Sequence, residues 1–147
     1  MKIFNLFKKA ETKTNTSLNN EQEISLFEND IHSEIFLQKV SELKDVDKKF
    51  QKGLNLLHFA CEHSNINLAK ELIKRHINIE EKNDYGNTPL WTAVFNSKGN
   101  YELVDLLLLH KANPDSINNA NNTPLKFAET INNEILIKKL KEAIANR

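Results

Sequence analysis

Residues 86–94 read GNTPLWTAV, and this stretch decides the fold because related stretches occur twice more in the chain. They are GLNLLHFAC at 53–61 and NNTPLKFAE at 121–129. The first two copies are 33 residues apart and the last two are 35 residues apart. A self-similar period of this length is typical of repeat architectures, in which each unit is one supersecondary element. We place the two additional residues of the second unit at Ser97 and Lys98.

The second half of each unit repeats as well. Asn65, Asn100 and Asn133 are each followed by apolar residues three, four and seven positions further on. This spacing predicts one apolar face of a helix. Each unit is therefore predicted to be two short helices joined by a turn, followed by an extended connection to the next unit. The expected fold class is all-α.

The residue types in the repeated stretch fit the local structure that this prediction requires. Pro89 suits the first helical turn, where its missing N–H is no loss, and the hydroxyl of Thr88 can cap the helix. The third copy has the same Thr-Pro pair. Gly86 suits a turn with positive φ, and Asn121, which tolerates that conformation, takes the equivalent position. Leu56 replaces the proline in the first unit, which predicts a weaker helix start there.

The pattern Gly-x-Thr-Pro-Leu-x-x-Ala, followed by Gly-Asn, an apolar pair, Leu-Leu and a closing Ala-Asn, resembles the ankyrin repeat. The resemblance implies an all-α solenoid of about three recognisable helix-turn-helix repeats plus a degenerate N-terminal capping unit. The leader is poor in apolar residues and is expected to be disordered. Lys141 stands at a position where the repeat usually has a second Leu, and a charged residue there suits the polar outer side of a capping repeat. The expected divisions are a disordered leader (1–20) and an ankyrin-repeat domain (21–147), the latter divided into a degenerate capping repeat (21–50), repeat 1 (51–83), repeat 2 with the insertion (84–118) and a C-terminal capping repeat (119–147).

The composition argues against several classes of protein. Twenty Lys and Arg balance twenty Asp and Glu, whereas a nucleic-acid-binding protein needs excess positive charge. No apolar run approaches the roughly 18 residues that span a bilayer. The apolar part of residues 1–10 is too short for a secretory signal, and a weak membrane-surface anchor is the alternative for it. Cys61, the only cysteine, fits a reducing compartment, so we expect a cytoplasmic protein.

Two histidines near Cys61 raise the question of a catalytic thiol. Cys61 falls on a small-residue position of the repeat that faces the packed interior, where a thiol is inert. The resemblance implies that His58 ties its turn to the neighbouring repeat, and His63 is not expected to activate the thiol. The histidines fall in different units without metal-ligand spacing, and three glycines cannot build a phosphate loop. We therefore expect no enzyme activity, no cofactor and no metal.

The resemblance implies that partners bind the concave face, formed by the turn tips and the exposed side of each first helix. Aromatic residues dominate binding hot spots, so Tyr85, Trp91 and Phe95 are the candidates of most interest. Their alternative role is local packing around the insertion, and the loop near Ser97 is an alternative contact site. The predicted partner-binding residues are Lys52, Glu62, His63, Asp84, Tyr85, Asn87, Trp91, Phe95, Asn96 and Thr130.

Residues 85–99 and 121–133 are similar to a group of short bacterial ankyrin proteins. Members of that group are often found beside secreted polymorphic toxins and are thought to serve as their immunity partners. The similarity implies a cytoplasmic immunity protein that binds and occludes one cognate toxin. We expect the free chain to be a monomer. The alternative is a general ankyrin adaptor or scaffold, or a host-directed bacterial effector, that binds other protein partners. Neither nucleic acid nor a membrane is expected as a partner.

Overall fold

The computed structural model describes residues 34–41 and 45–147, and all regular elements in these residues are helices. The predicted all-α class is confirmed. The chain forms two compact units that divide after Lys44. In the first unit the structure describes α3 (Glu34–Ser41), on which Val40 is buried. The predicted leader, 1–20, lies outside the described residues.

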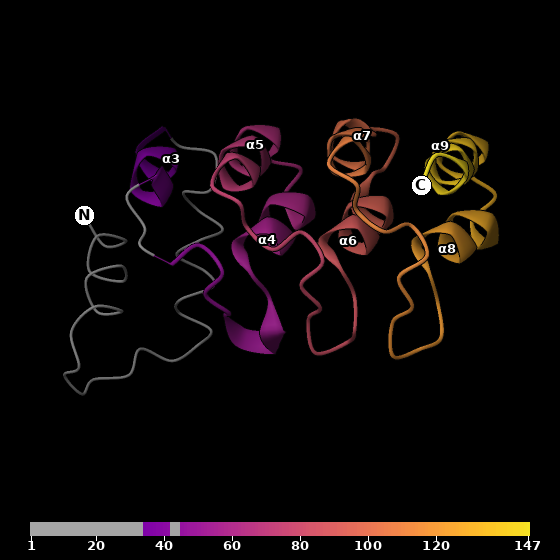
Figure 1. Ribbon diagram of the computed structural model, residues 1–147, viewed down its shortest axis with the longest axis horizontal. Helices are drawn as coiled ribbons and strands as arrows, with labels where there is room; N and C mark the ends of the chain where they lie inside the picture. The colour runs from indigo at the N-terminus through magenta and orange to yellow at the C-terminus, as the bar shows by residue number, and fades with distance from the viewer. Residues whose placement is uncertain (1–33, 42–44) are drawn as a thin grey trace. The chain divides into compact units, whose positions relative to one another are not determined.

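The second unit is built from three helix pairs, each of which corresponds to one repeated stretch of the sequence. Figure 1 shows the first helix of every pair in one row and the second helices in another, with the long connecting loops extending from the first row. A short 3-10 turn, η1 (Gln51–Gly53), precedes the first pair. The pairs are α4 (Leu56–Glu62) with α5 (Ile66–Lys74), α6 (Pro89–Asn96) with α7 (Glu102–Leu109), and α8 (Pro124–Thr130) with α9 (Glu134–Ala145).

Local side-chain caps fix where the first helices begin. Thr88 Oγ1 accepts a hydrogen bond of 3.3 Å from the backbone N–H of Trp91. Thr123 Oγ1 accepts the equivalent bond of 3.0 Å from Lys126. A proline opens each of these two helices, so the predicted Thr-Pro start is confirmed for α6 and α8.

The start of α4 has a different cap that offsets the missing proline. Asn55 Oδ1 accepts hydrogen bonds of 3.1 Å from the backbone N–H groups of Leu57 and His58. In return, His58 Nδ1 accepts a bond of 3.2 Å from the backbone N–H of Asn55. This reciprocal arrangement is a capping box. The weaker start predicted from Leu56 is thus compensated by the residue before it.

The core runs continuously through the stack because each pair buries its apolar side against the next. Leu57 and Leu90, on successive first helices, are fully buried. Leu72, Leu107 and Leu140, on successive second helices, are fully buried as well. Such contacts between neighbouring units supply the core that no single unit could bury alone.

The long loops are joined to one another by backbone hydrogen bonds. The N–H of Asp84 donates to the carbonyl of Lys52 at 2.9 Å, and the N–H of Asn119 donates to the carbonyl of Tyr85 at 3.0 Å. Gly86 lies where two loops touch: its φ is +74°, and an added Cβ would lie 2.8 Å from the backbone nitrogen of Asn119. Only glycine fits this combination of backbone conformation and close approach.

The turn between the two helices of the second unit is longer than the equivalent turns of the first and third units. Residues 63–65 join α4 to α5 and residues 131–133 join α8 to α9, whereas residues 97–101 join α6 to α7. Within the longer turn Ser97 is buried, and Lys98 has a φ of +44°. The turn therefore enlarges one end of the second unit without disturbing the helices on either side.

Candidate partner-binding surface

Three aromatic rings from two first helices form a cluster. On α6 the rings of Trp91 and Phe95 are stacked, with centroids 5.3 Å apart and planes 14° apart. The ring of Phe127, on α8, lies 5.5 Å from Trp91 and 5.4 Å from Phe95. Trp91 and Phe127 are half-buried, while Phe95 is 54% exposed. These three residues, called here the aromatic cluster, form an apolar surface whose rings hold one another in place.

Phe127 is the member of the cluster that the sequence did not predict. It occupies the repeat position of Phe59, which is buried in the first unit and packs edge-on against Phe50 with ring centroids 5.6 Å apart. Comparison with Phe59 therefore predicts that Phe127 is a core residue. The sequence could still have indicated its role in the aromatic cluster, because Phe127 comes one position after the residue equivalent to Trp91. On α8 this position brings the ring of Phe127 to the side of α6.

Tyr85 stands apart from the aromatic cluster. Tyr85 makes no ring contact with Trp91, Phe95 or any other aromatic residue in the part of the chain that the structure describes. Its backbone is fixed by the hydrogen bond from Asn119 described above, and its side chain is 57% exposed. Tyr85 therefore presents an aromatic ring at a loop tip held by its neighbour.

Most of the other predicted contact residues are exposed at the loop tips or at the ends of the first helices. Lys52 and Asp84 are exposed at successive tips. Glu62 and Thr130 are exposed at the last positions of α4 and α8, the repeat positions equivalent to that of Phe95. The remaining two predicted contact residues are half-buried. Asn96 is the last residue of α6, and His63 directly follows α4.

Asn87 has three of its polar groups, the side-chain oxygen, the backbone N–H and the carbonyl oxygen, engaged within the chain. Its Oδ1 accepts a hydrogen bond of 2.7 Å from Asn118 Nδ2, and its N–H donates to Asn83 Oδ1 at 3.0 Å. Its carbonyl oxygen lies 2.9 Å from His58 Nε2, which donates to it. We therefore leave Asn87 out of the contact surface proposed below, because it links adjacent repeats instead.

His58 joins the first repeat to the second, as the resemblance implied. The side chain is fully buried, with Nδ1 facing the N–H of Asn55 and Nε2 facing the carbonyl of Asn87. Burial lowers the pKa of His58 and outweighs the hydrogen bond to Asn87 and the charge of Glu81, which both raise it. The ring is therefore neutral, with its proton on Nε2.

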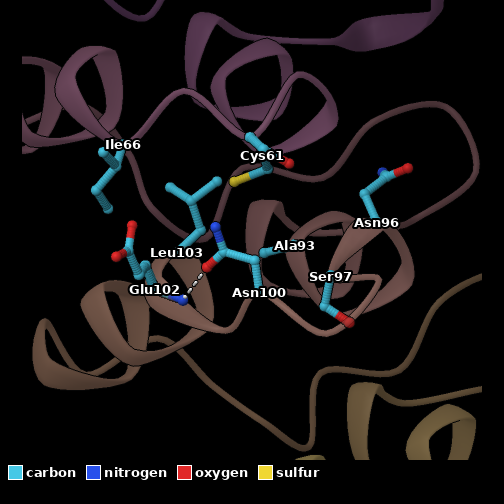
Figure 2. Close-up of a pocket in the computed structure, with 9 residues that line it drawn as sticks. Cys61, Ile66, Ala93, Asn96, Ser97, Asn100, Glu102 and Leu103 are labelled. Atoms are coloured by element: carbon cyan, nitrogen blue, oxygen red, sulfur yellow. Dashed lines mark hydrogen bonds between the residues drawn. The ribbon is translucent and has the colours of Figure 1, made fainter.

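Cys61 is a buried packing residue, as predicted. It is 1% exposed, and burial raises the pKa of its thiol, which stays protonated. Figure 2 shows its sulfur directed into a small space between the first two helix pairs, beside Leu103 and Asn100. The volume of this space is about 10 Å³, enough for one water molecule and too small for a substrate.

A larger hollow of about 270 Å³ lies between α7 and α9. Lys139 and Asp105, which line it, form an ion pair with an N–O distance of 2.7 Å. No group of three or more His, Cys, Asp or Glu side chains suited to a metal ion occurs in the described part of the chain. None of the helices described is long and apolar enough to cross a membrane.

A protein-family model described as "Ankyrin repeats (3 copies)" matches residues 27–118, which is more than half of the chain. The matched range ends before α8. No curated protein matches the chain.

Proposed function

Since the chain belongs to the ankyrin-repeat family, a family of protein-binding modules, we propose that it binds one protein partner through its first helices. The contact surface, called here the recognition face, consists of the exposed side chains of α4, α6 and α8 with the tips of the loops that precede them. The observation that carries the proposal is the aromatic cluster, in which Phe95 is more than half exposed although it is held by two neighbouring rings.

The aromatic cluster makes the second and third repeats the energetic centre of the recognition face. The residues equivalent to Phe95 on the neighbouring first helices are Glu62 and Thr130, which are both polar. Ile131 is 47% exposed and lies four residues after Phe127, so it extends the apolar surface along α8. A stacked ring loses little conformational freedom on binding, which favours affinity.

A more specific form of the proposal is that the chain is a cytoplasmic immunity protein that covers the active site of a bacterial toxin. The support for this form is the similarity of residues 85–99 and 121–133 to ankyrin proteins found beside toxins. Inhibition would follow from steric occlusion by a preformed surface, with little rearrangement on binding. The alternative, an adaptor or effector, uses the same face for weaker binding to several partners.

The proposal is tested by affinity capture from a lysate of the source cell, followed by calorimetry with the purified partner. The Tyr85→Ala/Phe95→Ala variant should lose the partner captured by the wild type. Phe95→Ala alone should weaken binding by at least about tenfold, because hot-spot residues contribute about 2 kcal/mol or more. Leu109→Ala is the matched control, since Leu109 is 74% exposed but lies on α7, a second helix.

Partner retention by the double variant at wild-type strength would move the binding site away from the recognition face. Circular dichroism of both variants establishes that they are folded. The more specific proposal, that the chain is an immunity protein, is tested separately. The chain is added to the captured partner, and the partner's toxic activity is measured. Loss of that activity at equimolar ratio supports an inhibitor, whereas several partners with no loss of activity favour the adaptor.

A further inference from the structure

The hollow between α7 and α9 belongs to the second helices and not to the recognition face. The two helices are neighbours in the row of second helices (Figure 1). The volume of the hollow, about 270 Å³, is close to the roughly 300 Å³ at which small-molecule sites begin. The side chains that line it come from both helices and from the residues that follow them. We call it the second-helix hollow.

The second-helix hollow coincides with two departures from the preceding junction of the stack. Between α5 and α7 the equivalent positions hold Ile77, which is 4% exposed, and Pro114, which is buried as well. Ala112 takes the place of Ile77, and Arg147 takes the place of Pro114. Alanine leaves space that isoleucine would fill, and arginine can extend its charged end into water. The repeat pattern alone therefore does not require this hollow.

Apolar and cationic side chains line the second-helix hollow together. Leu108, Ala112 and Ala143 supply apolar surface and are buried or half-buried. Lys111 and Arg147, which line the same hollow, are exposed. A molecule in the hollow would therefore meet apolar surface and positive charge at once.

The two acidic residues of the hollow are engaged elsewhere. Asp105 is bound by Lys139, whose Nζ lies 2.7 and 2.9 Å from the two carboxylate oxygens. The carboxylate of Glu142 lies 3.9 Å from Nζ of Lys138, on the same helix. In the part of the chain that the structure describes, neither acid pairs with the two exposed cations of the hollow. Their positive charge is thus left uncompensated.

Both exposed cations keep hydrogen-bond donors for a ligand. Lys111 forms no ion pair with any of the residues described. Arg147 donates one hydrogen bond from Nη1 to Asn113 Oδ1, and its guanidinium has further N–H donors. Carboxylate and phosphate groups form charge-assisted hydrogen bonds with both side-chain types. The donors of the hollow therefore suit an anionic group.

The position of the two cations also allows a purely structural role. Lys111 follows the end of α7, and Arg147 follows the end of α9. Positive charge near the C-terminus of a helix interacts favourably with the helix dipole. That role needs neither the apolar surface nor the hollow, and it makes no distinction between ligands. Ligand binding therefore separates the two roles.

We propose that the second-helix hollow binds a small organic anion. The carboxylate or phosphate group of this ligand contacts Lys111 and Arg147. Its short apolar body packs on Leu108, Ala112 and Ala143. Bare phosphate would use only the charges, and a neutral apolar molecule would use only the apolar surface. The inference concerns a different surface from the proposed function and does not depend on it.

The test uses small aromatic probes and nuclear magnetic resonance of the isotope-labelled full chain. Benzoate and phenyl phosphate carry the two anionic groups on the same apolar ring. Benzyl alcohol keeps the ring without the charge, and inorganic phosphate keeps the charge without the ring. We expect saturable shifts of backbone amide signals at the ends of α7 and α9 with the two aromatic anions, and much weaker binding of the other two probes.

Two variants remove one part of the site each. Lys111→Met/Arg147→Gln should weaken binding of the aromatic anions at least about tenfold, because two charge-assisted hydrogen bonds are lost. Ala143→Leu fills the hollow and should weaken the aromatic anions while leaving inorganic phosphate unchanged. The matched control, Lys70→Met/Lys126→Gln, removes two exposed positive charges outside the hollow and should bind like the wild type.

Three results would each overturn the inference. They are equal weakening by the control variant and the Lys111→Met/Arg147→Gln variant, binding of benzyl alcohol as tight as that of benzoate, and the absence of saturable binding by either aromatic anion. Tighter binding of one aromatic anion than of the other would support the inference and identify the anionic group. Circular dichroism establishes that the variants are folded. If the double variant does not fold, Arg147→Gln is compared with Lys126→Gln.

Discussion

His58 shows how one buried side chain connects two repeats and makes stability depend on pH. The neutral ring accepts a hydrogen bond from Asn55 and donates one to Asn87. Burial lowers the pKa of His58 below its ordinary value of 6.5 in the folded protein. As the pH falls below 6.5, the unfolded chain therefore takes up a proton before the folded chain does, and folding loses free energy.

We predict that the free energy of unfolding falls as the pH drops below 6.5 towards the folded-state pKa of His58. Urea denaturation at a series of pH values measures this free energy of unfolding. Glu81 also has a lowered pKa, caused mainly by its hydrogen bond with Lys49, but its contribution is lost only below its ordinary value of 4.5. His58→Gln should abolish the fall that begins near 6.5. The exposed His110, replaced by Gln, should leave it in place; a fall that survives His58→Gln would contradict the assignment.

Gly86 and Gly99 allow the effect of backbone conformation to be separated from that of close contact. Both have positive φ, +74° and +93°, but an added Cβ meets Asn119 only at Gly86 and meets nothing within 4 Å at Gly99. Gly99→Ala should cost about 1 kcal/mol through the backbone alone, and Gly86→Ala clearly more. Chemical denaturation of both variants checks the order. Equal losses would mean that the loops separate without penalty.

At the scale of the helix, local signals were sufficient to predict where α6 and α8 begin. The Thr-Pro start, the apolar spacing of the second helices and the site of the insertion all depend on residues close together in sequence. The cap of α4 was missed because Asn55 acts jointly with His58. The roles of Phe127 and Asn87 were missed for a different reason: both are set by contacts with another repeat, and a pattern within one repeat does not contain them.

The caps give a prediction for a single helix. Thr88→Ala removes the acceptor for the N–H of Trp91 at the start of α6, and Thr88 is 2% exposed, so water cannot replace it well. We expect a loss of about 1–2 kcal/mol in the free energy of unfolding. Thr88→Ser keeps the hydroxyl and should recover the capping part of the loss. If the two variants lose the same amount, packing of the methyl group rather than the cap is responsible.

At the scale of the whole molecule, the helix pairs are held by contacts between neighbours along the stack. The ion pairs that connect different repeats, such as Lys49–Glu81 and Lys139–Asp105, each join an exposed side chain to a half-buried one at the surface, and such pairs contribute little to the free energy of unfolding. Apolar contacts therefore dominate, and the stability of the second unit should be a sum of terms for each pair and for each junction. A central pair takes part in two such junctions among the described helices, and the third pair in one.

The different number of junctions predicts different consequences for replacing two equally buried leucines. Leu90, on α6, and Leu140, on α9, are both fully buried, so either leucine-to-alanine change should cost about 2–5 kcal/mol locally. Leu140→Ala weakens one junction, and amide hydrogen exchange should rise mainly in α8 and α9. Leu90→Ala weakens the pair between two junctions, so exchange should rise in all three pairs. Hydrogen exchange followed by mass spectrometry, with segments resolved, distinguishes these patterns. Identical profiles for the two variants would show that the stack unfolds as one cooperative block, in which the position of a residue along the stack does not matter.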